Sequence, residues 1–326
     1  MNLSKLAKLA NVSVSTVSKA FADSDEISKE TKERIIELAK ETNCYEKYYR
    51  PKYPKKLIVV ICPEILGLHY GQMATNIEKE ITENGDTMVL SVSNFSAARQ
   101  NDLIDYYTKY LKPDGIIVIE PAGTIKNNTD IPIVQISFEN AAKNVYSVKA
   151  DIYPALNEAL TTLQNLGHTK IGFIGEKYAT AEFEFFKNAM AKKEIYVRKK
   201  HIVISDKRFL DAGYFGMEEM LKNGSLPTAI IAAYSHISVG MMQRIKECGL
   251  RVPEDISVIC MDDINVMPYS DKTLSCIKMH LDELSCIAID MLYQKIKRGY
   301  IRIEQAISVT REFEPGDTIG PASNQS

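Results

Sequence analysis

Residues 1–22 read MNLSKLAKLANVSVSTVSKAFA, and the spacing of their apolar residues predicts two short helices joined by a tight turn. Asn11 lies between them, where such a turn needs a residue that tolerates a left-handed backbone. The second helix is expected from about residue 14 to residue 21, because the hydroxyl of Ser13 can cap the amide of Ser15 or Thr16. This pattern is typical of a helix-turn-helix, a unit that can enter a groove of duplex DNA. The facing apolar residues would be Leu3, Leu6, Ala7 and Ala10 on the first helix, and Val12, Val17, Ala20 and Phe21 on the second.

The outward face of the second helix carries side chains that suit contact with DNA. It presents Val14, Ser15, Ser18 and Lys19, which are short or polar groups of the kind that reach base edges and phosphates. Residues 1–56 contain 12 Lys and Arg against 8 Asp and Glu, a net charge of +4; the whole chain is −2, so the rest is −6. A basic head on an acidic body directs the head alone to a polyanion.

Composition narrows the class of protein. A length of 326 residues suits two or three domains, and 45% hydrophobic with 25% charged residues is ordinary for a globular protein with a sizeable core. We expect no membrane span and no signal peptide. The six cysteines form no C-x-x-C pair, so we expect reduced thiols in a cytoplasmic protein, with no metal site and no cofactor.

The first 56 residues divide into a headpiece and a linker. Residues 26–43 predict a third helix that Ser28 caps and Asn43 ends, which completes an all-α helix-turn-helix headpiece over residues 1–44. Residues 45–56, YEKYYRPKYPKK, are aromatic, basic and interrupted by Pro51 and Pro54, and we interpret them as a linker or hinge.

From Leu57 onward the pattern predicts an α/β body. Continuous apolar runs typical of buried strands occur at 57–62, 87–92, 115–119, 133–136, 171–174, 201–204, 229–232 and 257–261, with helical segments between them. About 250 residues of this alternation is too much for one small sheet, so two Rossmann-like lobes are expected. The tail at 314–326, EPGDTIGPASNQS, is expected to be frayed.

The head motif Val12-Ser13-x-x-Thr16-Val17-Ser18-Lys19 and the body motifs LQNLGHTKIGFIG (163–175), LPTAIIA (226–232), GLRVPEDISVICMDD (249–263) and LSCI (274–277) resemble the lactose/galactose repressor (LacI/GalR) family of bacterial transcription regulators. The resemblance implies a periplasmic-binding-protein-like body at 57–326. Its lobes would be an N-lobe at about 57–150 and 281–303 and a C-lobe at about 151–280 and 304–314, with crossings near Ala150–Asp151, Met279–Leu281 and Arg302–Glu304. It also implies a homodimeric repressor that binds a roughly palindromic operator and a small-molecule effector in the interlobe cleft.

The resemblance assigns roles in the headpiece. Val14 and Ser15 would read bases, and Lys19 stands where relatives usually have Arg, so recognition of that base should be looser. Backbone-positioning contacts fall to Leu3, Ser13, Thr16, Ser28 and Thr31. For Ser28 the alternative is a purely structural cap. The linker lacks the leucine that relatives insert into the minor groove, so we expect contacts through Lys47, Arg50, Lys52 and Tyr48 or Tyr49; the alternative is a solvated tether.

The resemblance also places the effector site. His69, Tyr70, Asp151 and Asp262 map to the cleft. Where relatives carry an Arg this chain has Glu182, and Tyr234 stands in an Asn position. The cleft is therefore expected to lose a cation and an amide and to gain a carboxylate and a phenol. The expected effector is a sugar or a cationic or aromatic metabolite. The change disfavours a phosphorylated or simple neutral sugar, since Glu182, Asp151 and Asp262 would favour a cation and Tyr178, Tyr234 and Tyr70 offer stacking faces. The alternative is a cleft that binds little, in a regulator that responds to a protein partner.

Two other classes of function compete with this interpretation. A solute-binding receptor without a DNA role would need a signal peptide and no headpiece. An enzyme on a Rossmann-like scaffold would need a fingerprint that Gly172 and Gly175 do not complete, and His168 has no obvious nucleophile beside it. We therefore expect no enzymatic activity.

Overall fold

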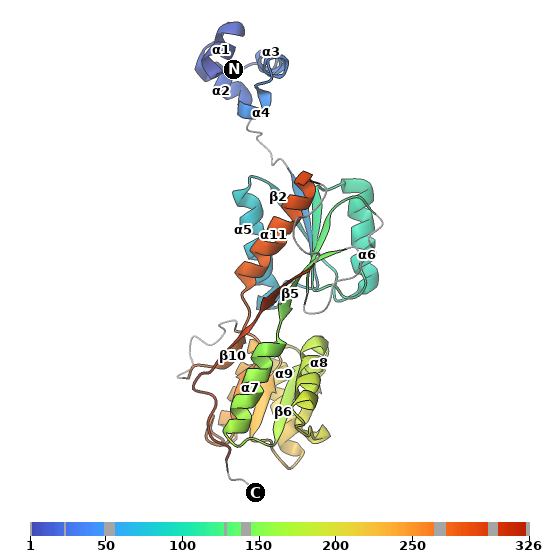
Figure 1. The fold of residues 1–326 in the computed structure, drawn as a ribbon, viewed down its shortest axis with the longest axis vertical. Helices are drawn as coiled ribbons and strands as arrows, with labels where there is room; N and C mark the ends of the chain where they lie inside the picture. Colours follow the sequence, from blue (N-terminus) through green and yellow to red (C-terminus); the bar gives the residue numbers. More distant parts are fainter. Residues whose placement is uncertain are drawn as a thin grey trace. The chain divides into compact units, whose positions relative to one another are not determined.

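The computed structural model describes residues 2–22, 24–48, 56–126, 129–137, 145–263, 272–298 and 306–323. Figure 1 shows a small helical unit at the N-terminus and two α/β lobes, which confirms the predicted fold class. Among these residues no helix is both long and apolar enough to cross a membrane.

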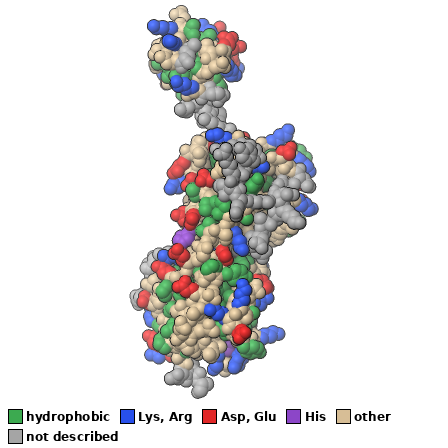
Figure 2. Space-filling view, viewed as in Figure 1, with side chains coloured by type: hydrophobic (Ala, Val, Ile, Leu, Met, Phe, Trp, Pro, Cys, Tyr) green, Lys and Arg blue, Asp and Glu red, His purple; other side chains and the backbone are tan. Residues whose placement is uncertain are grey.

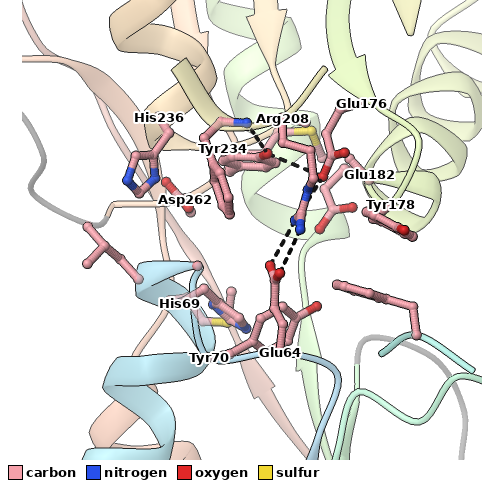
Figure 3. Close-up of a pocket in the computed structure, with 18 of the residues that line it drawn as sticks. Glu64, His69, Tyr70, Glu176, Tyr178, Glu182, Arg208, Tyr234, His236 and Asp262 are labelled. Atoms are coloured by element: carbon pink, nitrogen blue, oxygen red, sulfur yellow. Dashed lines mark hydrogen bonds and ion pairs between the residues drawn. The ribbon is translucent and has the colours of Figure 1, made fainter. Parts of the chain in front are cut away.

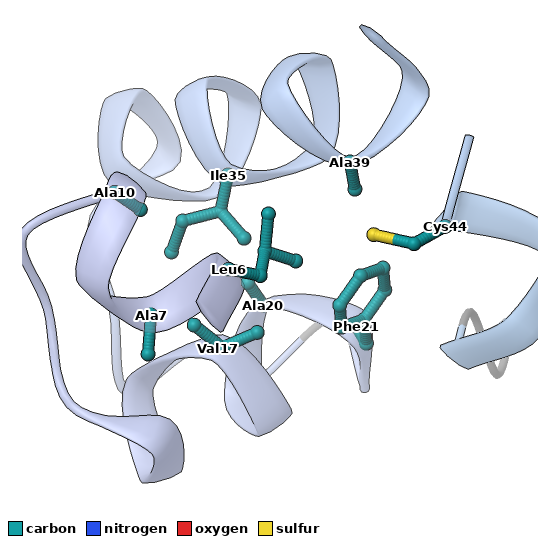
Figure 4. Packing of buried hydrophobic residues seen from close by; sticks show 9 residues of the cluster. All are labelled: Leu6, Ala7, Ala10, Val17, Ala20, Phe21, Ile35, Ala39 and Cys44. Atoms are coloured by element: carbon teal, nitrogen blue, oxygen red, sulfur yellow. The ribbon is translucent and has the colours of Figure 1, made fainter. Parts of the chain in front are cut away.

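The headpiece consists of three helices around a small apolar core. These are α1 Leu3–Leu9, α2 Val14–Phe21 and α3 Lys29–Glu41. Asn11 has a φ of 50°, as the tight turn requires. The third helix begins at Lys29 and not at residue 26, because the Ser28 hydroxyl accepts from the amide of Thr31 and so marks the start of the helix. The buried residues, drawn in Figure 4, are Leu6, Ala7, Ala10, Val17, Ala20, Phe21, Ile35, Ala39 and Cys44.

Part of the segment interpreted as a linker is folded. Residues Tyr45–Tyr48 form a short helix, α4, and the rings of Tyr45 and Tyr48 lie 6.3 and 6.1 Å from the ring of Phe21. These two tyrosines therefore extend the headpiece core, which a solvated tether would not do. Residues 49–55 lie outside the described part of the chain.

The first lobe is a six-stranded sheet of order β11-β5-β4-β3-β1-β2. Its strands are β1 Leu57–Cys62, β2 Thr87–Val92, β3 Gly115–Ile119, β4 Ile133–Ser137, β5 Tyr146–Asp151 and β11 Ala306–Thr310. Its helices are α5 Leu68–Glu83, α6 Ala97–Tyr106 with the π-helical turn η1 Tyr107–Leu111, and α11 Leu281–Arg298. Helices α5 and α11 cover one face of the sheet and α6 covers the other (Figure 1), where Ile104 packs on Val59, Ile61 and Ile116.

The second lobe repeats the plan with sheet order β12-β10-β9-β8-β6-β7. Its strands are β6 Ile171–Glu176, β7 Ile202–Ser205, β8 Ala229–Ala232, β9 Ser257–Cys260, β10 Ser275–Lys278 and β12 Glu312–Glu314. Its helices are α7 Tyr153–Asn165, α8 Thr180–Lys192, the 3₁₀ turn η2 Lys199–His201, α9 Phe209–Lys222 and α10 Ser235–Glu247. Helices α9 and α10 approach closely at glycines, since a Cβ on Gly213 would lie 1.9 Å from the carbonyl oxygen of Ile237.

Within the described residues the chain passes between the two sheets three times. It does so between β5 and α7, between β10 and α11, and at Arg311 between β11 and β12. The prediction of a third crossing near Arg302–Glu304, which itself lies outside the described residues, was wrong. The strand Ala306–Thr310 that follows pairs in parallel with β5, so it still belongs to the first sheet.

The prediction of a frayed tail was also wrong for residues 315–323. Thr318 is fully buried, and its hydroxyl donates to the carbonyl of Val258 and accepts from the amide of Ser275. The carbonyl of Gly320 bonds Nε2 of His168 over 2.9 Å. Hydrogen bonds to the second lobe hold this segment, and an apolar pattern in the sequence does not reveal them.

Candidate functional site

The recognition helix α2 exposes the side chains that the sequence assigned to DNA. Val14 is 44% exposed although it is apolar, and Ser15 and Ser18 are exposed beside it. Lys19 is half-exposed and forms an ion pair with Glu26. On the face shown in Figure 2, basic side chains stand on the headpiece surface and acidic ones gather on another part of it.

Two helix N-termini of the headpiece carry the same cap. Ser13 accepts from the amide of Thr16 over 3.0 Å, and Ser28 accepts from the amide of Thr31 over 3.3 Å. In each pair the two hydroxyls also bond each other at 2.8 Å. The N-terminus of a helix attracts anions, because its first amides and its dipole point outward. Ser28 thus caps α3, while phosphate contacts by these residues stay a prediction.

The remaining predicted DNA residues are spread over the headpiece. Leu3 is the first residue of α1, and its side chain is half-buried against the headpiece core. Lys47 is exposed on α4, with its ammonium 5.2 Å from the ring centroid of Tyr48. Arg50 and Lys52 lie outside the described residues.

The body contains a cavity at the carboxyl ends of strands from both sheets (Figure 3); its empty space, with open solvent included, is about 660 Å³. This edge is where parallel α/β sheets bind ligands. Six of the seven predicted effector residues line it: His69 and Tyr70 from α5, Tyr178 and Glu182 beyond β6, Tyr234 beyond β8, and Asp262 beyond β9. Their role in effector binding stays a prediction.

Asp151 does not line the cavity. It ends β5, and its carboxylate accepts from the amide of Tyr153 over 3.2 Å at the start of α7. Its backbone carbonyl accepts from the amide of Arg311 over 3.0 Å, so it ties the first crossing to the third. The structure therefore gives Asp151 a part in the crossings and does not place it with the other six residues.

The sequence interpretation considered only the cation that the cleft loses at the position of Glu182, and it missed two arginines in the cavity wall. Arg208 and Arg311 both line the cavity, together with the further residues Glu64, Phe95, Glu176, Phe209 and His236. Glu64, Glu176 and Arg208 each come within a few residues of the end of a predicted strand, which is a usable signal. Arg311 depends on the pairing of β11 with β5, which has no local signal in the sequence.

Arg208 has the strongest contacts in the cavity. Its Nη1 and Nη2 donate to the two carboxylate oxygens of Glu64 over 2.7 and 2.8 Å, and Nη2 lies 3.4 Å from Oε1 of Glu176. These hydrogen bonds raise the pKa of Arg208 above its usual range. Burial raises the pKa of Glu176, against the attraction of Arg208.

Two further carboxylates line the cavity, and burial disfavours their charged forms. Burial raises the pKa of Glu182 to about 7 and that of Asp262 to about 6. Asp262 accepts from the amide of Ser235 over 2.8 Å and from its hydroxyl, which holds the carboxylate in place. Burial lowers the pKa of Arg311 to about 10, against the attraction of Glu182.

The uncharged polar groups complete the wall. Burial lowers the pKa of His69 to about 3, so its imidazole is neutral at physiological pH. Burial raises the pKa of Tyr70 and Tyr234, so both phenols keep their protons and can donate hydrogen bonds. When its carboxylates are ionised, the cavity has a net negative charge. Four carboxylates then outnumber two guanidinium groups: Glu64, Glu176, Glu182 and Asp262 against Arg208 and Arg311. Across the described residues no group of three or more His, Cys, Asp or Glu is placed to hold a metal ion.

Comparisons with known proteins identify both parts of the chain. Residues 2–46 match the model of bacterial regulatory proteins of the lacI family, and residues 160–319 match the periplasmic binding protein-like domain. The chain thus carries a lacI-family helix-turn-helix domain followed by a periplasmic-binding-protein-like domain. Members of the lacI family are DNA-binding transcription regulators and not enzymes.

Curated relatives match this chain along nearly its whole length. The probable HTH-type transcriptional repressor ExuR of Bacillus subtilis is 26% identical over 98% of both chains. The ribose operon repressor of Haemophilus influenzae is 28% identical over 90% of this chain and 91% of its own. Among solved structures, the lac repressor dimer bound to operator and the anti-inducer ONPF has a TM-score of 0.71 at 20% identity, over 98% of this chain and 99% of its own, which shows the shared fold.

Proposed function

We propose that this chain represses transcription by binding operator DNA through its headpiece and that a small molecule in the interlobe cleft controls the binding. The observation that carries the proposal is the combination, in one chain, of a capped helix with exposed Val14 and Ser15 and a charged cavity at the carboxyl ends of the body's strands. An effector that favours one arrangement of the lobes would alter how the headpieces engage DNA.

We propose further that the active form is a homodimer in the bacterial cytoplasm. A two-fold dimer reads two related half-sites, so its operator would be roughly palindromic. In each half-site Val14 would touch a thymine methyl and Ser15 would form a hydrogen bond with a base edge. Lys19 would give up its ion pair with Glu26 and contact DNA instead. Lys lacks the planar fork of Arg, so the base opposite Lys19 should be specified loosely.

For the effector we propose a small molecule that combines a cationic group with hydroxyl groups. The acidic balance of the cavity supports a cation, because a positive charge offsets the repulsion among buried carboxylates. Carboxylates and neutral phenols also bond hydroxyl groups, and the exposed ring of Tyr178 offers a stacking face.

Selection of duplexes from a random pool tests the DNA part of the proposal. We expect enriched sequences with two inverted half-sites, retained in a gel at low salt and released as salt rises. Lys19→Ala should weaken retention about tenfold or relax one base position, whereas Lys222→Ala, an exposed lysine of the body, serves as the matched control. Failure of the wild-type chain to retain any selected duplex would refute the proposed function.

A thermal-shift screen of sugars, amino sugars, polyamines and nucleosides tests the effector part. A ligand that binds only the folded state stabilises it by about 2.7 kcal/mol at a hundred times its Kd. We expect the melting temperature to rise with amines more than with matched neutral sugars. A response to neutral sugars alone would contradict the cationic effector, and no response to any compound would favour control by a protein partner.

A further inference from the structure

Arg208 joins the two lobes across the cleft. Glu64 follows β1 of the first lobe, whereas Arg208 follows β7 and Glu176 ends β6 of the second. The bidentate bond from Arg208 to Glu64 therefore runs from one lobe to the other, as the dashed lines in Figure 3 show. The side chains of Glu64 and Glu176 are almost fully buried, so this contact is shielded from solvent.

Three aromatic rings surround the same guanidinium. Its Cζ lies 4.5 Å from the ring centroid of Phe209, 4.8 Å from that of Tyr178 and 5.7 Å from that of Phe95. Phe95 and Tyr178 come from different lobes and stack, with centroids 4.3 Å apart and planes 12° apart. Carboxylates combined with aromatic faces are the surroundings in which proteins hold alkylammonium and guanidinium ligands. In this chain a side chain of the protein itself fills that place.

The backbone on both sides of the guanidinium is strained. Phe95 has a φ of 56° and Phe209 a φ of 55°, a region that bulky side chains rarely adopt. Such conformations persist where the surroundings over-determine them, and they gather at functional sites. The packing of both rings on Arg208 supplies this support.

We propose that Arg208 is a tethered cation that latches the two lobes together while the cleft holds no effector, and that an effector bearing an ammonium or guanidinium group releases the latch by competing for Glu64 and Glu176. The inference rests on the proposed function, because it assigns a mechanism to the same cleft. Within the described part of the body, Oε2 of Glu176 and Nε of Arg208 are buried and have no hydrogen-bond partner. The subsite thus keeps a carboxylate oxygen that Arg208 does not bond and an incoming cation can.

The latch can be measured in the full-length chain through two of its own thiols. Cys248 in the second lobe and Cys286 in the first are exposed, whereas Cys44, Cys62, Cys260 and Cys276 are buried. Energy transfer between dyes on the two exposed thiols, with labelled chains diluted in unlabelled ones, reports the separation of the lobes. Arg208→Ala should lower the transfer, and Arg251→Ala, which removes an exposed arginine paired with Asp255, should not.

Chemical rescue separates a cation subsite from a general loss of packing. Ethylguanidinium should restore energy transfer in Arg208→Ala and should fail to do so in Arg208→Ala combined with Glu64→Gln. In the wild-type chain agmatine, which carries an ammonium and a guanidinium group, should lower the transfer, and glucuronate should leave it unchanged. If glucuronate lowered the transfer and agmatine did not, the competition for the carboxylates would be overturned.

The operator affinity of Arg208→Ala tests whether the latch controls DNA binding. Arg208→Ala should shift operator affinity about fivefold or more, in the same direction as an effector does, and should abolish the response to amines. Unchanged energy transfer and unchanged operator affinity in Arg208→Ala would overturn the latch. Failure of the wild-type chain to bind any duplex would instead refute the proposed function, and the energy-transfer measurement would still decide the latch.

Discussion

Replacing Glu182 by Gln should stabilise the body at neutral and alkaline pH and weaken effector binding at the same time. Burial raises the pKa of this carboxyl from 4.5 to about 7. One pKa unit corresponds to about 1.4 kcal/mol, so ionising Glu182 in the folded chain destabilises it by up to about 3 kcal/mol. Gln has nearly the same shape and stays neutral, which removes this term.

The sign of the pH dependence follows from the direction of the pKa change. The folded chain holds the Glu182 proton more tightly than the unfolded chain does, so unfolding releases it between pH 4.5 and about 7. The destabilisation is absent below pH 4.5, grows through this window and is complete above it. The difference in unfolding free energy between the Glu182→Gln variant and the wild-type chain should grow in the same way.

Denaturant unfolding of the body across this pH window, followed by near-ultraviolet circular dichroism, measures the difference. Glu184→Gln is the matched control, because Glu184 is an exposed carboxylate on the same helix, 2.6 Å from Lys187. A constant difference between Glu182→Gln and the wild type at every pH would refute the raised pKa of the Glu182 carboxyl. A gain in stability without loss of amine binding would remove Glu182 from the proposed cation site.

Three further changes test the fold that supports the sites. Leu6→Ala should destabilise the headpiece by about 2–5 kcal/mol, because Leu6 is fully buried; gel retardation of operator should be lost while the thermal transition of the body stays in place. Ser13→Ala removes the cap of α2 and should destabilise the headpiece by about 1 kcal/mol, read from the loss of helical signal on heating. Gly213→Ala should destabilise the body by more than about 3 kcal/mol, because its Cβ would clash with the carbonyl of Ile237. Gly71→Ala on α5 is the control, because a Cβ has room there, and it should be neutral or slightly stabilising. Scanning calorimetry measures the melting temperature of both variants. Equal melting temperatures for the two glycine variants would contradict the close packing of α9 on α10.

Much of the fold was predictable because buried parallel strands are continuous apolar runs. LIVVIC at 57–62 and AIIA at 229–232 are of this kind, and both are strands with almost every residue buried. Strand β11 alternates exposed and half-buried residues at a sheet edge, and β12 has three residues, so neither stands out from the sequence. The segment after β12 escaped prediction because polar hydrogen bonds, such as those of Thr318, hold it.

The candidate site was predictable to the extent that it follows the ends of predicted strands. Tyr178, Tyr234 and Asp262, which the family resemblance assigned to the cleft, lie just beyond the ends of such strands, and Glu64 and Arg208 lie in equivalent places. The two arginines of the cavity were missed because each position was interpreted alone. The replacement of Arg by Glu182 suggested a missing cation, but two arginines from other segments supply positive charge to the same cavity. Local sequence gives the edge on which side chains gather, but long-range pairing decides which of them meet.

Arg311 marks the point where the chain leaves the first sheet for the second, and its guanidinium also forms part of the cavity wall, with Nη1 donating to the carbonyl of Met261 over 3.3 Å. Met279, beside the second crossing, lines the same cavity. An effector bound in this cavity, as proposed, would therefore contact residues at two of the crossings between the lobes. A movement of the lobes in response to the proposed effector would then need no relay of intermediate residues.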